Sequence, residues 1–192
     1  MNQRIDIMVD LETLGRSGEY TVFQIGAVAF NIITGEVLDT LDISSDITKD
    51  KDFRVDPETL MWWLKTDKEL LFNILENNNS IDSYDMFDYF KWWTLSLKNS
   101  GLTNIYLWGN GILFDNKIIQ DKMEQYKLDY PIHYRNDRDL RTVIDLTANK
   151  LGITEDELKE KFNDDNLTKH NGLDDAKYQV KMLVYCWKIL TE

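Results

Sequence analysis

Ile5-Asp6-Ile7-Met8-Val9-Asp10-Leu11-Glu12 is a short, mostly apolar stretch that ends in two carboxylates one residue apart. Because it is too short for an independent helix, we expect it to form a buried central β-strand. Side chains alternate along a strand, so Asp10 and Glu12 point to the same side at its carboxyl end. Ligands of open α/β sheets bind at that end, where two carboxylates suit Mg²⁺ or Mn²⁺.

The size of the chain and its single cysteine are typical of a one-domain protein without disulfides. We expect one domain that spans residues 1–192, long enough to bury a sizeable core. The chain contains no apolar run of about 18 residues, so we expect no membrane span, and too few residues precede Ile5 for a signal peptide. Cys186 has no cysteine with which to form an internal disulfide, which favours a cytoplasmic location.

The chain is strongly acidic, with a formal net charge of -12. This charge argues against long, salt-driven binding to duplex nucleic acid, which requires a basic surface. An acidic chain can still act on a phosphate backbone if divalent cations reverse the local charge and few nucleotides are held. Most of the acids are otherwise expected on the solvated surface.

The alternation and turn signals along the chain predict an α/β fold. Strands two and three, at 22–30 and 36–43, form an antiparallel meander with the first strand, and a further strand lies at 104–108. Helices are expected at 57–64, 68–75, 81–97, 113–126, 137–151 and 173–190, with a short capped helix after Thr154. The expected architecture is a mixed sheet with helices on its faces.

Three later residues are candidates to join Asp10 and Glu12. Asp115 follows the strand 104–108 through a glycine-containing turn, although an acid there can also simply favour a helix N-terminus. His170 stands in a loop before the last helix, and Asp175 lies in the first turn of that helix. A histidine beside a helix-borne carboxylate suits a general base with a metal ligand, although a lone histidine is more often structural.

Taken together, the order Asp10-x-Glu12, then Asp115, then His170-x-x-x-x-Asp175 resembles the DEDDh 3′-5′ exonucleases, which have a ribonuclease H-like fold. The resemblance extends from Ile5 to about Leu190. Three further stretches resemble the subgroup of phage exodeoxyribonuclease A and exodeoxyribonuclease VIII, namely Thr59-Leu-Met-Trp-Trp63, Trp108-Gly-Asn-Gly-x-x-Phe-Asp115 and Arg135-Asn-Asp-Arg-Asp-Leu-Arg-Thr142. The subgroup suggests a bacterial cell or a phage-infected host.

This resemblance implies a two-metal mechanism. The four acids are expected to hold two divalent cations, Mg²⁺ or Mn²⁺, and all five residues are expected to be catalytic: Asp10, Glu12, Asp115, His170 and Asp175. His170 would be the general base and not a metal ligand, because hard cations prefer oxygen. The expected products are 5′-mononucleotides.

Four residues are expected to contact the substrate. Thr13 is expected to meet the terminal sugar. At least one of Trp62 and Trp63 is expected to stack on a base, with one of them buried and the other at the rim; the alternative is that both lie in the core. Arg138 is expected to share a helix face with Arg141 and to meet phosphates, or instead to pair with neighbouring aspartates.

Three functional hypotheses follow from these residues. The first is a metal-dependent exonuclease that acts on the 3′ end of single-stranded nucleic acid, with DNA favoured over RNA. The second is a short-RNA exonuclease of the oligoribonuclease type. The third is a proofreading or recombination accessory that works through a protein partner. The sequence leaves open the choice between DNA and RNA, the acceptance of duplex ends and the oligomeric state.

Overall fold

The computed structural model describes residues 3–98 and 103–192, and its centre is a five-stranded sheet. The strands are β1 (Gln3–Thr13), β2 (Val22–Phe30), β3 (Val37–Ser44), β4 (Thr103–Gly109) and β5 (Asp137–Asp139). Their order is β3-β2-β1-β4-β5, with antiparallel pairing from β3 to β1 and parallel pairing from β1 to β5. The expected mixed sheet flanked by helices is confirmed.

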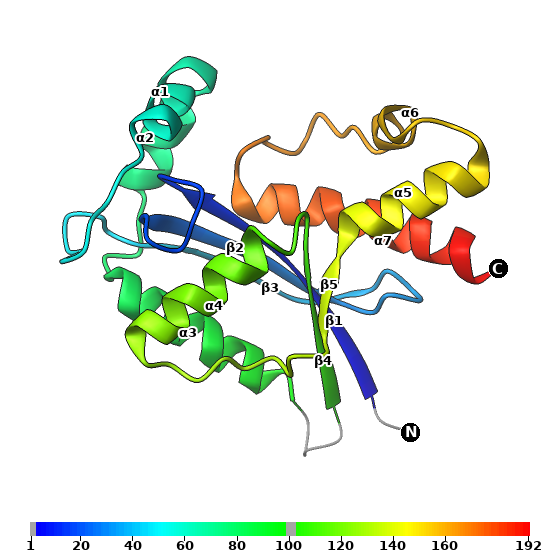
Figure 1. Cartoon of the computed structure of the whole chain (residues 1–192), viewed down its shortest axis with the longest axis horizontal. Coiled ribbons are helices and arrows are strands. Elements are labelled where there is room, and N and C mark those ends of the chain that lie inside the picture. Colours follow the sequence, from blue (N-terminus) through cyan, green and yellow to red (C-terminus); the bar gives the residue numbers. More distant parts are fainter. Residues whose placement is uncertain (1–2, 99–102) are drawn as a thin grey trace.

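The helices cover both faces of this sheet. They are α1 (Pro57–Thr66), α2 (Lys68–Glu76), α3 (Ser83–Ser96), α4 (Asp115–Tyr126), α5 (Leu140–Leu151), α6 (Glu155–Glu160) and α7 (Gly172–Thr191). Helices α3 and α4 lie on one face and α5 and α7 on the other (Figure 1). Ile7 and Val9 of β1 pack in the core under α3 and α4, whereas Met8 packs in the core under α5 and α7. None of the described helices is long and apolar enough to cross a lipid bilayer.

The register of β1 places its last acids beyond the end of the neighbouring parallel strand. The pairing of β1 with β4 ends at Val9 and Gly109, while the pairing with β2 continues past Asp10 and Glu12. The two acids therefore project where β4 turns away into the loop before α4. This gap at the carboxyl end of the parallel strands is where an open α/β sheet binds ligands.

Helix α7 lies unusually close to β2 because two glycines face each other. A Cβ atom on Gly26 would lie 1.9 Å from the main-chain carbonyl carbon of Gly172. The main-chain N–H of Gly172 also donates a hydrogen bond to Oε1 of Gln24 at 3.1 Å. These contacts fix the first turn of α7 directly over the sheet. The same turn lies beside Asp10, because a Cβ atom on Gly172 would be 3.1 Å from the carbonyl oxygen of Asp10.

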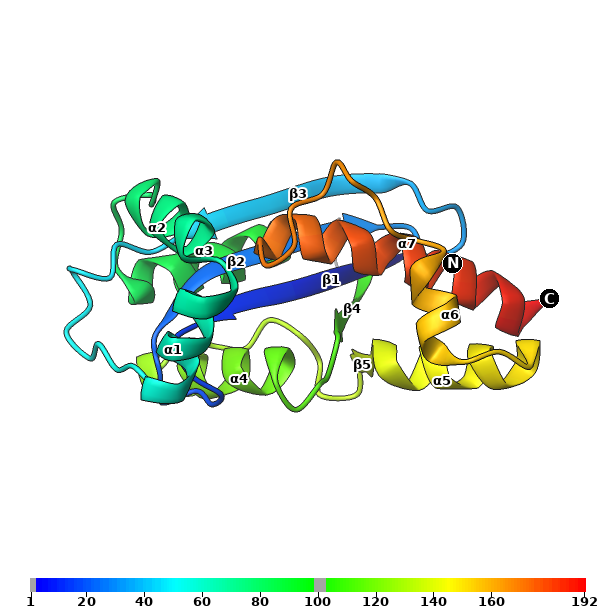
Figure 2. The same cartoon turned by 90° about the horizontal axis from the view of Figure 1, so that it is seen from above.

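Helices α1 and α2 project at the end of the sheet where β1 finishes (Figure 2). A small apolar cluster anchors them, consisting of Leu14, Phe23, Trp63, Leu71 and Ile74. Asp56 caps α1, with Pro57 at its first position, and the side chain of Asp67 caps α2. Both expected helices are therefore present, slightly longer than predicted.

The stretch from Asp137 to Asp139 forms β5, and the expectation that it begins a helix is wrong. These residues pair in parallel with Leu107–Gly109 of β4. The side chain of Asp139 then accepts the main-chain N–H of Arg141 at 2.8 Å, so that α5 begins only at Leu140. Strand pairing with β4 and the Asp139 cap therefore delay the start of α5, although the local sequence pattern is helical.

Candidate active site

Three carboxylates converge from two elements at the end of β1. Asp10 and Glu12 reach the site from the strand, and Asp175 reaches it from the first turn of α7. One carboxylate oxygen of each lies within 4.8 Å of the others. Residues from opposite ends of the chain therefore meet in one cluster, and the close approach of α7 to β2 is what brings them together.

Asp115 adds a fourth carboxylate from the start of α4. It is 3% exposed, and its Oδ1 accepts the main-chain N–H of Leu11 at 3.2 Å. Because Leu11 lies between Asp10 and Glu12, this hydrogen bond ties α4 to the middle of the acidic stretch. The negative charge of Asp115 contributes to raising the pKa of Asp10 and of Glu12.

Burial opposes ionisation of all four acids, and repulsion within the cluster adds to it for Asp10 and Glu12. The pKa of Glu12 is raised to about 10 and that of Asp115 to about 7, and the pKa values of Asp10 and Asp175 are also raised, with burial the largest cause in each case. Repulsion from Asp10 is the next cause for Glu12. Among the described residues, none of the four forms a salt bridge with a lysine or arginine. Such a cluster calls for cations to balance its charge.

His170 sits at the edge of this cluster in a left-handed backbone conformation, with φ of 65°. Its main-chain N–H donates to Oδ2 of Asp175 at 2.9 Å, and this hydrogen bond opposes the rise of the Asp175 pKa. The imidazole packs edge-on against Trp62 and Trp63, with ring centroids 5.0 and 6.2 Å away. The histidine is thus held between the acids and α1.

A cavity of about 430 Å³ opens beside Glu12 and is large enough for part of a nucleotide. Its lining is mostly apolar or small and comprises Leu11, Glu12, Thr13, Gly15, Arg16, Thr59, Trp62, Trp63 and Phe114. A flat ring beside the acids is suited to stacking on a nucleobase.

The two adjacent tryptophans differ in their access to this cavity. Trp62 is 44% exposed, whereas Trp63 is 1% exposed and donates its indole N–H to the carbonyl oxygen of Thr13 at 3.0 Å. The hydroxyl of Thr13 donates to the carbonyl oxygen of Gly15 at 2.5 Å. Trp63 therefore shapes the cavity wall from the core, and Trp62 is the ring that a base can reach.

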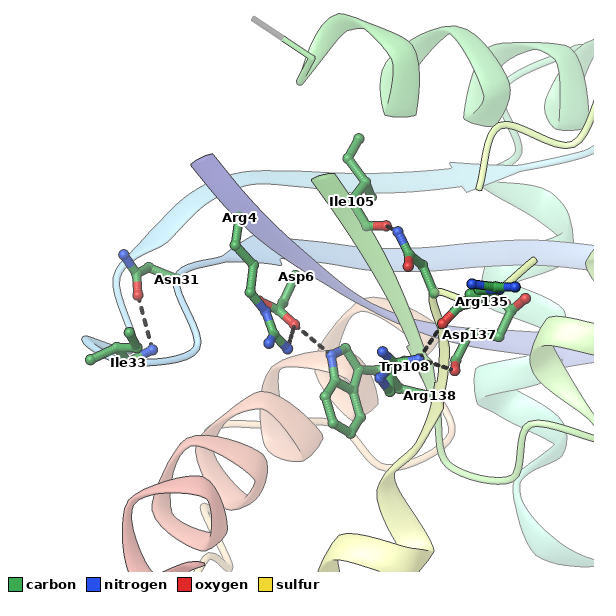
Figure 3. Close-up of polar contacts among 10 residues, drawn as sticks. Arg4, Asp6, Asn31, Ile33, Ile105, Trp108, Arg135, Asp137 and Arg138 are labelled. Carbon is green, nitrogen blue, oxygen red and sulfur yellow. Dashed lines mark hydrogen bonds and ion pairs between the residues drawn. The ribbon is translucent and has the colours of Figure 1, made fainter. Parts of the chain in front are cut away.

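Arg138 lies apart from the acids, on β5, so the helix face that it was expected to share with Arg141 does not exist. Its guanidinium donates to the carbonyl oxygens of Arg135 and Asp137 at 2.7 and 2.8 Å (Figure 3). It also stacks over the ring of Tyr106. The expected ion pairs with neighbouring aspartates are absent from the described structure; the main chain takes their place.

Arg141 lies closer to the acidic cluster than Arg138 does. Its guanidinium lies beside Gly111, in the loop that leads to Asp115, and its charge lowers the pKa of Asp115.

Gln179 is a further residue of the site that the sequence did not predict: its Nε2 donates to Oδ1 of Asp10 at 2.7 Å. The only available signal was its position four residues after Asp175, which puts both side chains on one face of α7.

Comparison with known proteins identifies relatives of the chain. Residues 5–187 match the family model described as the 3′-5′ exoribonuclease Rv2179c-like domain. No curated protein matches the sequence.

Solved structures with the same fold are distant in sequence. The nuclease domain of 3′hExo, a DEDDh family member bound to rAMP, is 15% identical over 96% of this chain and 92% of its own, with a TM-score of 0.62. The cell-death related nuclease CRN-4 is 12% identical over 97% of this chain and 64% of its own, with a TM-score of 0.70. A zinc-bound complex of E. coli ExoI with ssDNA is 15% identical over 94% of this chain but 39% of its own, with a TM-score of 0.62.

Proposed function

We propose that this chain, which belongs to the family of Rv2179c-like 3′-5′ exoribonuclease domains, removes 5′-mononucleotides from the 3′ end of single-stranded RNA. It is a 3′-5′ exonuclease by family. The observation that carries the proposed site is the meeting of Asp10, Glu12 and Asp175 at the end of β1, with the buried Asp115 hydrogen-bonded to the same stretch. A cavity lined by an exposed tryptophan opens beside them.

The donor set fits divalent cations. Asp10, Glu12, Asp115 and Asp175 offer only hard carboxylate oxygens, which Mg²⁺ and Mn²⁺ prefer. Burial raises the pKa of all four acids, and repulsion within the cluster raises it further for Asp10 and Glu12; bound cations would offset that repulsion. We propose that these four residues hold two such ions, which when bound neutralise the acids, stabilise charge on the phosphate and acidify water.

The residues of the chain then divide the remaining work. His170, hydrogen-bonded through its main chain to Asp175, takes the proton of the attacking water on its imidazole. The water oxygen bonds to the terminal phosphorus while the bond from phosphorus to the 3′ oxygen of the preceding nucleotide breaks. The leaving 3′ oxygen takes up a proton from solvent, and His170 returns its proton to solvent. The products are a 5′-mononucleotide and a strand with a new 3′ hydroxyl. Trp62 holds the terminal base, while Thr13 and Trp63 shape the cavity.

RNA is proposed ahead of DNA because the family model describes exoribonuclease domains. Single-stranded DNA remains the second candidate, because the motifs around Asp115 resemble the phage exodeoxyribonuclease subgroup and one structural neighbour is an ssDNA complex. The test compares kcat/KM for RNA and DNA of identical sequence and length. We expect RNA to be preferred by about tenfold, the effect of one hydrogen bond to a 2′-hydroxyl, and a preference for DNA would reverse the assignment.

Kinetics on RNAs of graded length also distinguishes an oligoribonuclease and an accessory factor from this function. Turnover confined to the shortest RNAs would indicate the oligoribonuclease type. Turnover that requires an added polymerase or repair protein would indicate an accessory factor. We propose that neither condition applies, because the cavity beside Glu12 is open to solvent and the described acids come from this chain alone.

Replacing Trp62 by alanine is expected to raise KM by about tenfold or more and to change kcat less, because a stacked base contributes about 1–3 kcal/mol. Steady-state kinetics on a short RNA measures both constants. Trp62→Phe retains an aromatic face and should recover most of the affinity. The control is Leu64→Ala, which removes an apolar side chain on the same helix that is 47% exposed and does not line the cavity. If Leu64→Ala raises KM as much as Trp62→Ala does, the proposed stacking of Trp62 on the base is wrong.

The stabilisation that Mn²⁺ confers should grow with pH. Each acid of the cluster has a raised pKa, so the folded state binds more protons than the unfolded state above about pH 4. Stability of the metal-free protein therefore falls as pH rises through the folded pKa of Asp115, about 7, and towards that of Glu12, about 10. Cations replace those protons.

Thermal unfolding at about pH 6 and about pH 8, with Mn²⁺ or EDTA, measures this effect, since the two values bracket the Asp115 pKa of about 7. We expect a larger rise in melting temperature on adding Mn²⁺ at the higher pH, and a smaller difference between the two pH values in Asp115→Asn. Equal rises at both pH values in the unsubstituted protein would contradict the electrostatic account of the cluster.

A further inference from the structure

Gln179 contacts the acidic cluster but takes no part in the chemistry proposed above. It lies one helical turn after Asp175 on α7, so both side chains extend from the same face of the helix toward β1. Its Nε2 donates a hydrogen bond of 2.7 Å to Oδ1 of Asp10, across 169 positions of sequence. The residue is 4% exposed, so this hydrogen bond is shielded from competing water.

The other end of the Gln179 amide has no partner. Its Oε1 is buried and accepts no hydrogen bond from any of the described residues. A buried carbonyl without a donor lowers the stability of the folded state, and an apolar side chain of similar size would fill the same space without that cost. The unpaired carbonyl therefore gives no reason for an amide at this position, whereas the hydrogen bond from its N–H to Asp10 does.

We propose that Gln179 is a positioning residue that fixes the rotation of the Asp10 carboxylate for cation binding, an inference that rests on the proposed metal site. An amide N–H is a suitable partner for this purpose because it donates to an ionised carboxylate without adding charge to a crowded site. The orientation of a metal ligand by such an outer hydrogen bond typically changes metal affinity by about 10–100-fold.

The position of Gln179 also connects Asp10 to the placement of α7. The helix that carries Asp175 is held against β2 by the contact of Gly26 with Gly172, and Gln179 lies about two turns after Gly172 on the same helix. A single rigid helix therefore sets the position of one ligand directly and the rotation of a second one through a hydrogen bond. This arrangement couples the two acids that come from opposite ends of the chain.

The test measures Mn²⁺ binding to the full chain without nucleic acid, from the electron paramagnetic resonance signal of free Mn²⁺. We expect Gln179→Leu to bind Mn²⁺ about 10–100-fold more weakly. Its melting temperature in EDTA should change little, because removal of the unpaired carbonyl offsets the loss of the hydrogen bond to Asp10. If the branched leucine prevents folding, Gln179→Met supplies an unbranched apolar side chain of the same length.

Kinetics provides a second reading. Gln179→Leu should require about 10–100-fold more Mn²⁺ for half-maximal activity, with the KM for RNA little changed and kcat recovering at high Mn²⁺. A purely structural role would instead lower activity at every Mn²⁺ concentration. The control is Val180→Ala, which shortens the neighbouring core side chain of α7 and should lower the melting temperature without changing Mn²⁺ affinity.

The outcomes separate this inference from the proposed function. Unchanged Mn²⁺ affinity in Gln179→Leu and in Gln179→Met, with normal binding by the unsubstituted protein, would overturn the positioning role and leave the metal site intact. Failure of the unsubstituted protein to bind Mn²⁺ would overturn the metal site itself. Equal weakening by Val180→Ala would also overturn the inference, because it would trace the effect to helix packing.

Discussion

Asp175→Asn is expected to reduce exonuclease activity by about 10³-fold or more while leaving the fold intact. The substitution keeps the size of the side chain and removes one of the carboxylates that meet at the end of β1. A catalytic cation contributes several kcal/mol of transition-state stabilisation, and about 1.4 kcal/mol corresponds to a tenfold change in rate. Because burial raises the pKa of Asp175, its loss should not destabilise the metal-free protein.

The matched control is the preceding residue. Asp174 forms a salt bridge with Lys177 at 3.0 Å and accepts the main-chain N–H of Thr168 at 3.1 Å, so it points away from the cluster. Asp174→Asn should keep nearly full activity. Measurement of kcat/KM for both variants, with circular dichroism to verify folding, tests the register of the motif. An inactive Asp174→Asn beside an active Asp175→Asn would contradict the proposed set of ligands.

Gly26→Ala is expected to lower activity by about 10²-fold or more and to destabilise the protein by about 1–3 kcal/mol, which lowers the melting temperature by several degrees. The new Cβ would lie 1.9 Å from the carbonyl carbon of Gly172, and a main-chain atom cannot rotate away as a side chain can. Helix α7 must therefore shift from β2 and take Asp175 with it. A displacement of about 1 Å at a reacting group is enough for such a loss of rate.

Gly152→Ala is the control that separates an effect of lower stability from an effect of moving α7. Gly152 has a φ of 67° and no atom within 4 Å of a Cβ built on it, so alanine there strains the backbone without a clash. It should cost about 1 kcal/mol of stability and leave kcat/KM unchanged. Melting temperature and kcat/KM are measured for both variants. Full activity of Gly26→Ala would show that the close approach of α7 is not needed for catalysis.

The elements that carry the acids were predictable because their signals are local. The run from Ile5 to Glu12 departs from strand-like alternation only at Met8. The caps at Asp56 and Thr154 follow short-range rules. The β5 strand escaped prediction because its three residues, Asp137 to Asp139, are all charged and become a strand only by pairing with β4. The placement of Arg138 failed for the same reason.

The parts of the site that sequence reasoning missed depend on long-range contacts. Gly26 stands within an apolar strand, where its lack of a side chain has meaning only once α7 lies against it. The role of Gln179 depends on Asp10, 169 positions away. The two tryptophans could be identified as one core and one surface residue, but which is which follows from the hydrogen bond of Trp63 to Thr13.

We propose that the cluster of Asp10, Glu12, Asp115 and Asp175 hydrolyses nucleic acid from its 3′ end with divalent cations. The decisive experiment incubates 5′-labelled single-stranded RNA with the purified protein and Mn²⁺ and resolves the products on a sequencing gel. A ladder that shortens stepwise from the 3′ end, and disappears with EDTA or in Asp175→Asn, is the predicted result. Internal cleavage, release of the labelled 5′ nucleotide first, or equal degradation by Asp175→Asn would show that these acids do not form a 3′-5′ exonuclease site.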